Sequence, residues 1–285
     1  MQCWSNSSEL RTYVHECIKT IGIRPSKFSG QNFLIDASII NFQVQQAEIN
    51  SKDIILEVGG GIGNLTKCLV KNAKKVYVIE FDKRLYDFLN DNFSIYDKVE
   101  IILGDAVKVE WPHFTKCVAN LPYQISSPFT FKLLATTFEK SLLLYQKEFA
   151  MRMQAKPGEK HYSRLSVMVQ FKALCRYLKT IKPTSFYPPP KVESALVELK
   201  PKDYTIEIEE ELFQLFVTKL FNNKKQLVRK VVARLCKNLN DIEETRSIIQ
   251  NLPLSNRRVF TLTLEELFEI FGYLRDYLTK IQGLT

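Results

Sequence analysis

The stretch Ile54-Ile55-Leu56-Glu57-Val58-Gly59-Gly60-Gly61-Ile62-Gly63 joins a short, mostly apolar run directly to a glycine-rich turn. The apolar run predicts a buried strand, and residues 65–72 predict a helix after the turn. Glycines between a strand and a helix let the backbone approach a ligand closely, which favours a nucleotide-like ligand. The dinucleotide fingerprint needs a further glycine where Asn64 stands, and a P-loop needs a Gly-Lys-Ser or Gly-Lys-Thr ending that is absent here.

Strand and helix patterns continue to alternate after this turn. We expect strands at residues 75–80, 99–103, 116–120, 141–145, 166–171 and 195–200, with helices at 83–90 and 128–134 and from Lys147. Strand, helix and strand at this spacing build a parallel sheet with right-handed crossovers. The sequence therefore predicts an α/β fold with a Rossmann-like sheet.

The chain divides into three parts by its patterns. Residues 1–25 form an N-terminal extension with a short amphipathic helix at 9–21, and residues 26–201 form the sheet domain. Within that domain, residues 182–191 contain four prolines and are expected to form an extended loop. From residue 202 to 285 the periodicity is helical, which predicts a small helical domain.

Composition limits the possible classes of function. The net charge of +9 suggests a polyanionic partner, although a basic surface is also common on solvated proteins. Six scattered cysteines and three histidines make a disulfide framework and a structural zinc site unexpected, and we expect no metal. With no signal region and no run approaching a membrane span, we expect a cytoplasmic monomer without a membrane partner.

Acidic residues lie at three points of the predicted sheet. Glu57 begins an acid-x-Gly-x-Gly-x-Gly pattern that resembles the first motif of S-adenosylmethionine-dependent methyltransferases. A carboxylate there favours a cationic sulfonium and amino group and would repel pyrophosphate. Glu80 ends the second strand, where it can accept hydrogen bonds from both ribose hydroxyls, as NAD enzymes also arrange, and Asp105 is placed to receive the adenine amine of the cofactor. Helix capping or a solvated loop is the alternative for each acid.

The tetrapeptide Asn120-Leu121-Pro122-Tyr123 ends the strand at 116–120, because proline cannot continue a strand ladder. The Asn120 side-chain oxygen and the carbonyl of Leu121 or Pro122 can accept both hydrogens of an exocyclic amine, while Tyr123 stacks on the base. The alternative is a strand-ending turn with a core tyrosine.

These motifs occur in an order that resembles one family. Asn120 to Tyr123 is similar to the fourth motif of amino methyltransferases that act on adenine. The whole resembles the small-subunit ribosomal RNA adenine N6,N6-dimethyltransferases, the kasugamycin-resistance family, in its archaeal and eukaryotic branch. The matching stretches lie at 31–34, 57–66, 78–80, 104–106, 120–127 and 186–195.

The resemblance implies a Rossmann-like methyltransferase sheet with a C-terminal helical RNA-recognition domain. It also implies methyl transfer to the N6 amines of two adjacent adenosines in a 16S-type rRNA hairpin during ribosome biogenesis. It implies Asn120, Leu121, Pro122 and Tyr123 as catalytic residues, with Phe186 or Tyr187 on the other face of the adenine. The cofactor residues implied by pattern and resemblance are Gln31, Asn32, Leu34, Glu57, Gly59, Gly61, Gly63, Glu80, Asp105 and Asn120.

A basic run follows in the helical part, from Leu220 to Lys237, with no acidic residue. Its pattern gives one apolar and one basic face, which indicates either a solvated helix or contact with the RNA backbone through Lys224, Lys225 and Arg229. Two other functions stay open: a non-catalytic RNA-binding ribosome assembly factor, and a DNA adenine methyltransferase. An oxidoreductase is disfavoured by the incomplete dinucleotide fingerprint.

Overall fold

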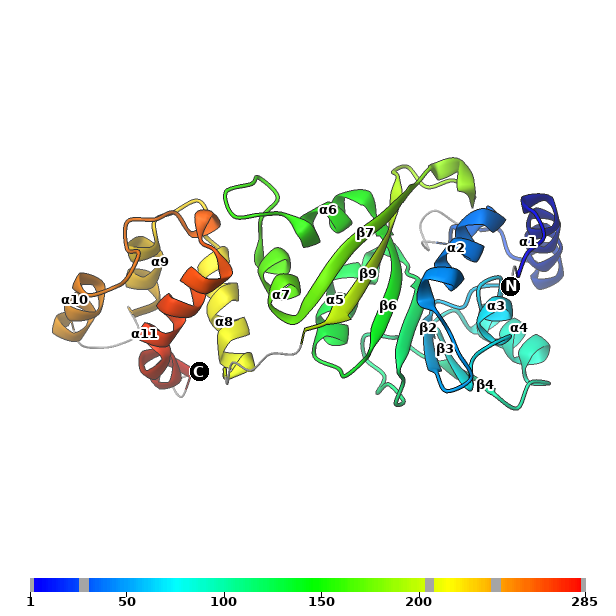
Figure 1. Ribbon diagram of the computed structural model, residues 1–285, viewed down its shortest axis with the longest axis horizontal. Helices are drawn as coiled ribbons and strands as arrows, with labels where there is room; N and C mark the ends of the chain where they lie inside the picture. Colours follow the sequence, from blue (N-terminus) through cyan, green and yellow to red (C-terminus); the bar gives the residue numbers. More distant parts are fainter. Residues whose placement is uncertain (1–2, 26–30, 203–207, 237–241, 283–285) are drawn as a thin grey trace. The chain divides into compact units, whose positions relative to one another are not determined.

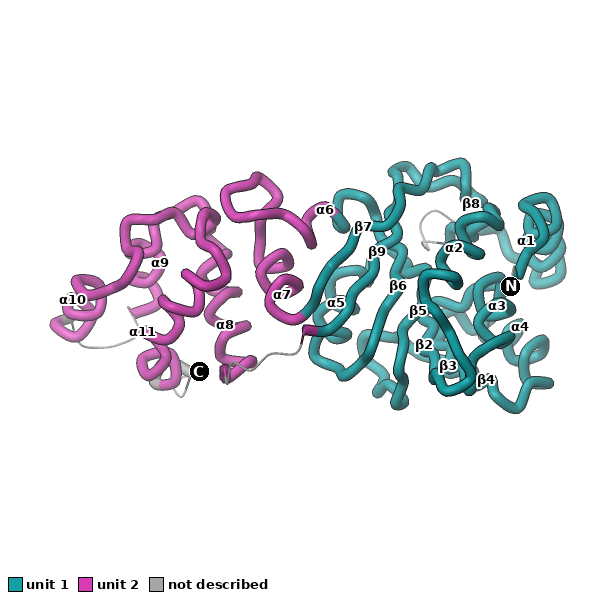
Figure 2. The backbone as a smooth tube through the Cα atoms, viewed as in Figure 1, with its two compact units in different colours: residues 1–150, 173–201 teal, residues 151–172, 202–285 magenta. Residues whose placement is uncertain are grey.

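The computed structural model describes residues 3–25, 31–202, 208–236 and 242–282. The chain forms two compact units, residues 1–150 with 173–201 and residues 151–172 with 202–285 (Figure 2). The domain bounds expected from the sequence placed residues 151–172 in the sheet domain. The structure groups this segment with the C-terminal helices, because Phe171 packs its ring 5.1 Å from that of Phe213 and 5.6 Å from that of Phe268.

The first unit contains a seven-stranded sheet in the order β4-β3-β2-β5-β6-β9-β7 (Figure 1). Its first five strands in the chain run parallel, and the last two are antiparallel to their neighbours. The strands are β2 (Ile54–Val58), β3 (Lys75–Glu80), β4 (Val99–Leu103), β5 (Lys116–Asn120), β6 (Lys140–Gln146), β7 (Ala173–Ile181) and β9 (Ser194–Pro201). The predicted α/β class and Rossmann-like sheet are confirmed.

Helices cover both faces of this sheet. They are α1 (Ser7–Ile21), α2 (Ala37–Ala47), α3 (Thr66–Leu69), α4 (Lys83–Phe93), α5 (Ser126–Leu134) and α6 (Lys147–Gln154). Residues of α1 to α4 share one buried cluster with Val118, Leu142 and Leu144. Tyr145, whose side chain points the other way from β6, bonds Thr130 of α5 (Oη to Oγ1, 2.8 Å). Helices α1 to α4 therefore cover one face and α5 the other.

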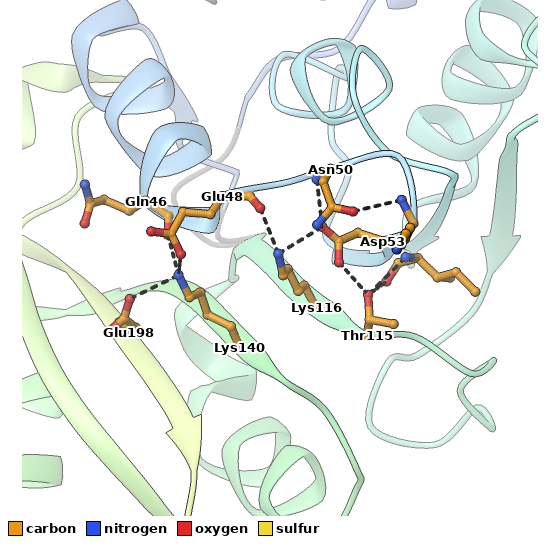
Figure 3. A network of polar contacts seen from close by, with 10 residues as sticks. Gln46, Glu48, Asn50, Asp53, Thr115, Lys116, Lys140 and Glu198 are labelled. Atoms are coloured by element: carbon orange, nitrogen blue, oxygen red, sulfur yellow. Dashed lines mark hydrogen bonds and ion pairs between the residues drawn. The ribbon is translucent and has the colours of Figure 1, made fainter.

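A network of polar side chains holds the amino ends of β5 and β6 (Figure 3). Lys116 Nζ pairs with Asp53 Oδ2 at 2.9 Å and donates to the Glu48 carbonyl at 2.8 Å. Lys140 Nζ pairs with Glu48 and donates to the Gln46 carbonyl at 3.1 Å. Buried lysines need such partners, so this end of the sheet is fixed by structure, and the opposite end, where the strands finish, is left for a ligand.

Two sequence predictions in this region were wrong or incomplete. The predicted strand at 166–171 is a helix, α7 (Arg164–Lys172). Its residues 165–169 and 171 are all buried, and a short apolar run without alternation does not distinguish a buried strand from a buried helix. The edge strand β7 was not predicted, because its mixed, mostly half-exposed residues carry little apolar signal.

The second unit is helical, as predicted. With α7 it contains α8 (Glu210–Phe221), α9 (Val228–Leu235), α10 (Ile242–Gln250) and α11 (Leu264–Gln282). Aromatic rings form its core: the ring centroid of Phe213 lies 5.3 Å from that of Phe271 and 6.2 Å from that of Phe216.

Cys3 and Cys68 are joined by a disulfide, with their Cα atoms 5.3 Å apart. The sequence had argued against a disulfide framework, and it gave no sign of this single bond because the partners are 65 residues apart. Among the described helices, none has the length and apolar character needed to cross a membrane.

Candidate active site

A cavity of about 650 Å³ lies where the parallel strands β2, β3, β4 and β5 end. In open α/β sheets ligands bind in this position. The segments that follow these four strands line it, at 58–61, 79–83, 104–106 and 120–125. Further lining comes from Asn64, Leu85 and Leu144, and from Phe186 with residues 31–34.

The glycine turn after β2 depends on glycine at specific positions. Gly59, Gly61 and Gly63 have φ values of 75°, 59° and 77°, a region that side chains with a Cβ disfavour. A Cβ at Gly59 would lie 3.2 Å from Pro122 Cδ. The turn is therefore in direct contact with the Asn120-Leu121-Pro122-Tyr123 segment. Gly63 does not line the cavity, and a Cβ there would clash with the ring of Phe93.

Glu80 connects the glycine turn to the end of β3. Its Oε2 accepts from the Gly61 N–H at 2.8 Å, and its Oε1 accepts from the N–H groups of Phe81 and Asp82, both at 2.9 Å. Burial raises the pKa of Glu80, and these three donors oppose the rise by favouring the charged form. The carboxylate thus lies at the cavity and also fixes the shape of its rim.

Glu57, in contrast, does not line the cavity. It is buried, and its Oε2 accepts from the Thr66 hydroxyl at 2.7 Å. Burial, above all, raises the pKa of Glu57 to about 8, so the side chain is largely neutral at pH 7. The expected attraction of this carboxylate for a cationic sulfonium has no support in this geometry.

Asp105 follows β4 and lines the cavity. Its Oδ1 accepts from the Val107 N–H at 2.9 Å, and its Oδ2 lies 3.7 Å from Lys108 Nζ. No described helix begins directly after Asp105, so the helix-capping alternative does not apply: its side chain holds a turn and lines the cavity.

Asn120 is the last residue of β5, and its Oδ1 is buried with no hydrogen-bond partner among the described residues. Buried acceptors are almost always paired in folded proteins, so an orphan at a cavity indicates a donor supplied by a ligand. The Pro122 carbonyl accepts from the Ile125 N–H at 3.2 Å. Of the two carbonyls considered from sequence, Leu121 is therefore the better second acceptor.

Tyr123 is held in place by Ser194, the first residue of β9, whose Oγ lies 2.6 Å from the tyrosine Oη. Burial raises the pKa of Tyr123, which keeps the phenol neutral. Sequence reasoning missed Ser194, because the two residues are 71 positions apart. The tyrosine presents a fixed aromatic ring at the cavity.

The proline-rich loop contributes one aromatic residue to the cavity. Its strand β8 (Phe186–Tyr187) pairs antiparallel with β1 (Phe33–Leu34), so that Leu34 lies opposite Phe186. Phe186 is buried and lines the cavity, whereas Tyr187 packs its ring 4.7 Å from that of His15. Gln31 also lines the cavity and donates to Asp82 Oδ2 at 3.1 Å.

The structure therefore brings most of the predicted site residues to one cavity. Those that line it are Gln31, Asn32, Leu34, Gly59, Gly61, Glu80, Asp105, Asn120, Leu121, Pro122, Tyr123 and Phe186. Outside its lining lie Glu57, Gly63, Tyr187, Lys224, Lys225 and Arg229.

The predicted basic face belongs to the second unit. Lys225 and Arg229 are exposed, but Lys224 Nζ donates to the carbonyls of Lys160 and Tyr162, at 2.9 and 2.6 Å. Sequence analysis missed Arg258, an exposed residue whose guanidinium donates to the Lys225 carbonyl at 2.6 Å. Arg258 therefore belongs to the basic face, whereas Lys224 has a structural role, because its ammonium group is bonded to backbone carbonyls. Lys237 lies outside the described residues.

The cavity suits an adenosine cofactor with a positive charge. Gly59, Gly60 and Gly61 line it without side chains, Glu80 and Asp105 bring carboxylates to it, and Asn120 lines it with an acceptor that has no partner among the described residues. A Rossmann-like sheet with these groups at the ends of four successive parallel strands defines an S-adenosylmethionine-dependent methyltransferase. Residues 24–274 match the family model described as ribosomal RNA adenine dimethylase. The chain belongs to this family.

Relatives and solved structures agree with this assignment. The chain is 48% identical over 258 residues to a probable ribosomal RNA small subunit methyltransferase A of Pyrococcus abyssi, covering 90% of this chain and 94% of the relative. A dimethyladenosine transferase from Plasmodium falciparum has a similar structure, with a TM-score of 0.75 and 29% identity over 86% of this chain and 98% of that one. The 23S rRNA methyltransferase ErmE gives a TM-score of 0.64 and 25% identity, over 86% and 100%.

Proposed function

We propose that this chain transfers methyl groups from S-adenosylmethionine to the exocyclic N6 amines of two adjacent adenosines in a small-subunit ribosomal RNA hairpin. The observation that carries the proposal is Asn120, which lines the cavity and whose buried Oδ1 has no partner among the described residues. An amine N–H is the donor that this acceptor lacks. Membership of the rRNA adenine dimethylase family and the names of the relatives support RNA adenine as the source of the amine.

Residues at the rim and floor of the cavity hold the cofactor. Glu80 accepts from a ribose hydroxyl with the one lone pair of Oε2 that its three backbone donors leave, and Asp105 accepts from the adenine amine. Gly59 and Gly61 allow the backbone to approach, and Gln31 fixes Asp82 beside Glu80. The cofactor supplies a methyl group on a cationic sulfur.

Alignment is the main chemical task of the protein. The adenine amine is a poor nucleophile because its lone pair is delocalised into the ring. Asn120 Oδ1 and the Leu121 carbonyl accept its two hydrogens, which favours a more tetrahedral nitrogen with the lone pair directed at the methyl group. The transient cation loses its proton to water, because a neutral Tyr123 is no base.

Aromatic rings hold the base that the amine belongs to. Tyr123, oriented by Ser194, stacks on one face of the adenine, and Phe186 forms the opposite wall. Extruding a stacked base costs a few kcal/mol, which stacking on such rings partly restores.

The second unit contributes affinity for the RNA backbone. Its exposed cations Lys225, Arg229 and Arg258 can contact phosphates. We propose that the chain acts as a monomer on precursor small subunits in the cytoplasm.

Transfer of tritiated methyl groups to purified, undermethylated small subunits, followed by nucleoside analysis, tests the proposal. We expect label in N6,N6-dimethyladenosine. Label in N6-methyladenosine alone would contradict dimethylation, and label in duplex DNA in place of the particle would favour a DNA methyltransferase. Particle maturation that survives in an Asn120→Ala variant without methyl transfer would favour an assembly factor.

A further inference from the structure

The N-terminal extension is part of the folded core. The family match begins at residue 24, yet Trp4, Leu10 and Val14 are at most 1% exposed and belong to the same buried cluster as α2, α3 and α4. This extension had no assigned role from sequence. Its burial against the helices around the cavity shows that it is more than a tail.

Two side chains of the extension bind the glycine turn directly. Trp4 Nε1 donates to the carbonyl of Asn64 at 3.0 Å, and the Tyr13 hydroxyl donates to the carbonyl of Ile62 at 2.8 Å. These carbonyls flank Gly63, whose φ is 77°. Both donors therefore act on the end of the glycine turn, next to the cavity-lining Asn64.

A further hydrogen bond connects the glycine turn with strand β1, on the other side of Asn64. The Asn64 side chain donates through Nδ2 to the Leu34 carbonyl at 2.8 Å, and both residues line the cavity. Asn64 thus links Trp4 on one side with the cavity-lining strand β1 on the other.

Trp4 itself is fixed from two directions. Asn41 of α2 accepts from the Trp4 N–H at 3.2 Å and donates to the Trp4 carbonyl at 2.8 Å. The disulfide joins the preceding residue, Cys3, to Cys68 of α3. A donor held this firmly loses little entropy when it bonds the turn.

Helix α1 also contacts the other segments that frame the cavity. The Ser7 hydroxyl accepts from the Ala37 N–H at the start of α2, at 3.1 Å. The His15 ring packs edge-on against Tyr187, beside the cavity-lining Phe186. One helix thus touches the glycine turn, the β1–α2 segment and the proline-rich loop.

We propose that Trp4 and Tyr13 are positioning residues that hold the glycine turn in the shape that receives the methyl donor. The inference rests on the proposed function, because it assumes that the cavity binds S-adenosylmethionine. The turn has three glycines at positive φ, and because glycine loses more conformational freedom on folding than any other residue, neighbouring contacts are needed to hold the turn in one shape. The two donors supply that constraint before the cofactor arrives.

Tyr13→Phe tests this role with little change in packing, since it removes only the hydroxyl donor; Trp4→Phe also removes a donor but shrinks a fully buried side chain, so it is the less specific test. We expect Tyr13→Phe to raise the Kd for S-adenosylhomocysteine, measured by calorimetry, about 2- to 10-fold, the range for losing one hydrogen bond. The KM for S-adenosylmethionine should rise in parallel, while the KM for small subunits and kcat stay within about twofold.

Tyr162→Phe is the matched control. The Tyr162 hydroxyl is also buried and donates to a backbone carbonyl, that of Leu262, at 2.9 Å, but in the helical unit. We expect it to lower the Tm about as much as Tyr13→Phe and to leave the cofactor Kd unchanged. If Tyr13→Phe lowers only the Tm, the extension is merely structural and the inference is wrong. If the native chain binds no S-adenosylhomocysteine, the proposed function itself fails.

Discussion

Replacing Asn120 with alanine should separate stability from activity. The side-chain oxygen is buried without a partner, and leaving a buried acceptor unpaired costs the free protein about 1–3 kcal/mol. Removing this acceptor should offset the weaker packing around the shorter alanine side chain. We expect the free energy of unfolding to stay within about 1 kcal/mol of the native value, or to rise.

The same change should nearly abolish methyl transfer. One preorganised hydrogen-bonding group at a reacting centre contributes about 2.7–4 kcal/mol, which corresponds to a loss of about 10²- to 10³-fold in kcat. Single-turnover transfer to undermethylated small subunits measures the chemical step. Urea unfolding followed by circular dichroism measures stability, and calorimetry with S-adenosylhomocysteine verifies an intact cofactor site.

Gln43→Leu is a control for this experiment. Gln43 Oε1 is also buried without a partner, but Gln43 lies in α2 and does not line the cavity. We expect its kcat to match the native chain. The reasoning would be refuted if Asn120→Ala kept methyl transfer within about threefold of native. It would also be refuted if the variant lost more than about 2 kcal/mol of unfolding free energy, as expected when a buried group with a hydrogen-bond partner is removed.

Three further predictions follow from other parts of the chain. Burial raises the pKa of Glu57 from 4.5 to about 8, so its contribution to stability is complete below pH 4.5 and is lost as the pH rises toward 8. Glu57→Gln should reduce this loss by about 1.4 kcal/mol per pH unit in urea unfolding, and an unchanged pH dependence would contradict the burial argument. Reduction of Cys3–Cys68, which spans 65 residues, should lower the free energy of unfolding by about 4 kcal/mol; a Cys3→Ser variant should not respond to dithiothreitol, and equal native stability with and without it would contradict the expectation. Lys225→Ala with Arg229→Ala should reduce the slope of log affinity for RNA against log salt by about 1–2 without altering cofactor affinity; an unchanged slope would exclude phosphate contact.

The parallel strands were predictable because burial on both faces leaves a simple signal. Strands β2 and β3 are mostly buried and begin and end where the apolar runs predicted. Strand β4 also has the predicted bounds, although none of its residues is buried. The first run is followed by Gly59, the second ends with Glu80 and is followed by Phe81, and the third is followed by Gly104. The ends of the strands that face the ligand were therefore also evident. Helix α7 was not distinguishable from a strand, because all of its central residues are buried.

The supporting contacts of the site could not be predicted in the same way. Trp4 reaches a carbonyl 60 residues away, and Tyr123 reaches Ser194 across 71 residues. Every residue has a carbonyl acceptor, so the sequence does not indicate which carbonyl a side chain will bond. The same holds for Lys224, which looks like any exposed lysine until its two carbonyl partners are known.

Glu57 illustrates how a motif can locate a site while suggesting the wrong physics for one member. Its position beside the glycine turn predicted a charge facing a sulfonium, but the side chain does not line the cavity, and burial raises its pKa to about 8. Its bond to Thr66 instead ties β2 to the first residue of α3. Asp105 and Glu80 are the carboxylates that reach the cavity, and the N–H donors on Glu80 favour its charged form. Electrostatic attraction for a cationic cofactor must therefore come from the ends of β3 and β4, and β2 contributes the shape of the turn.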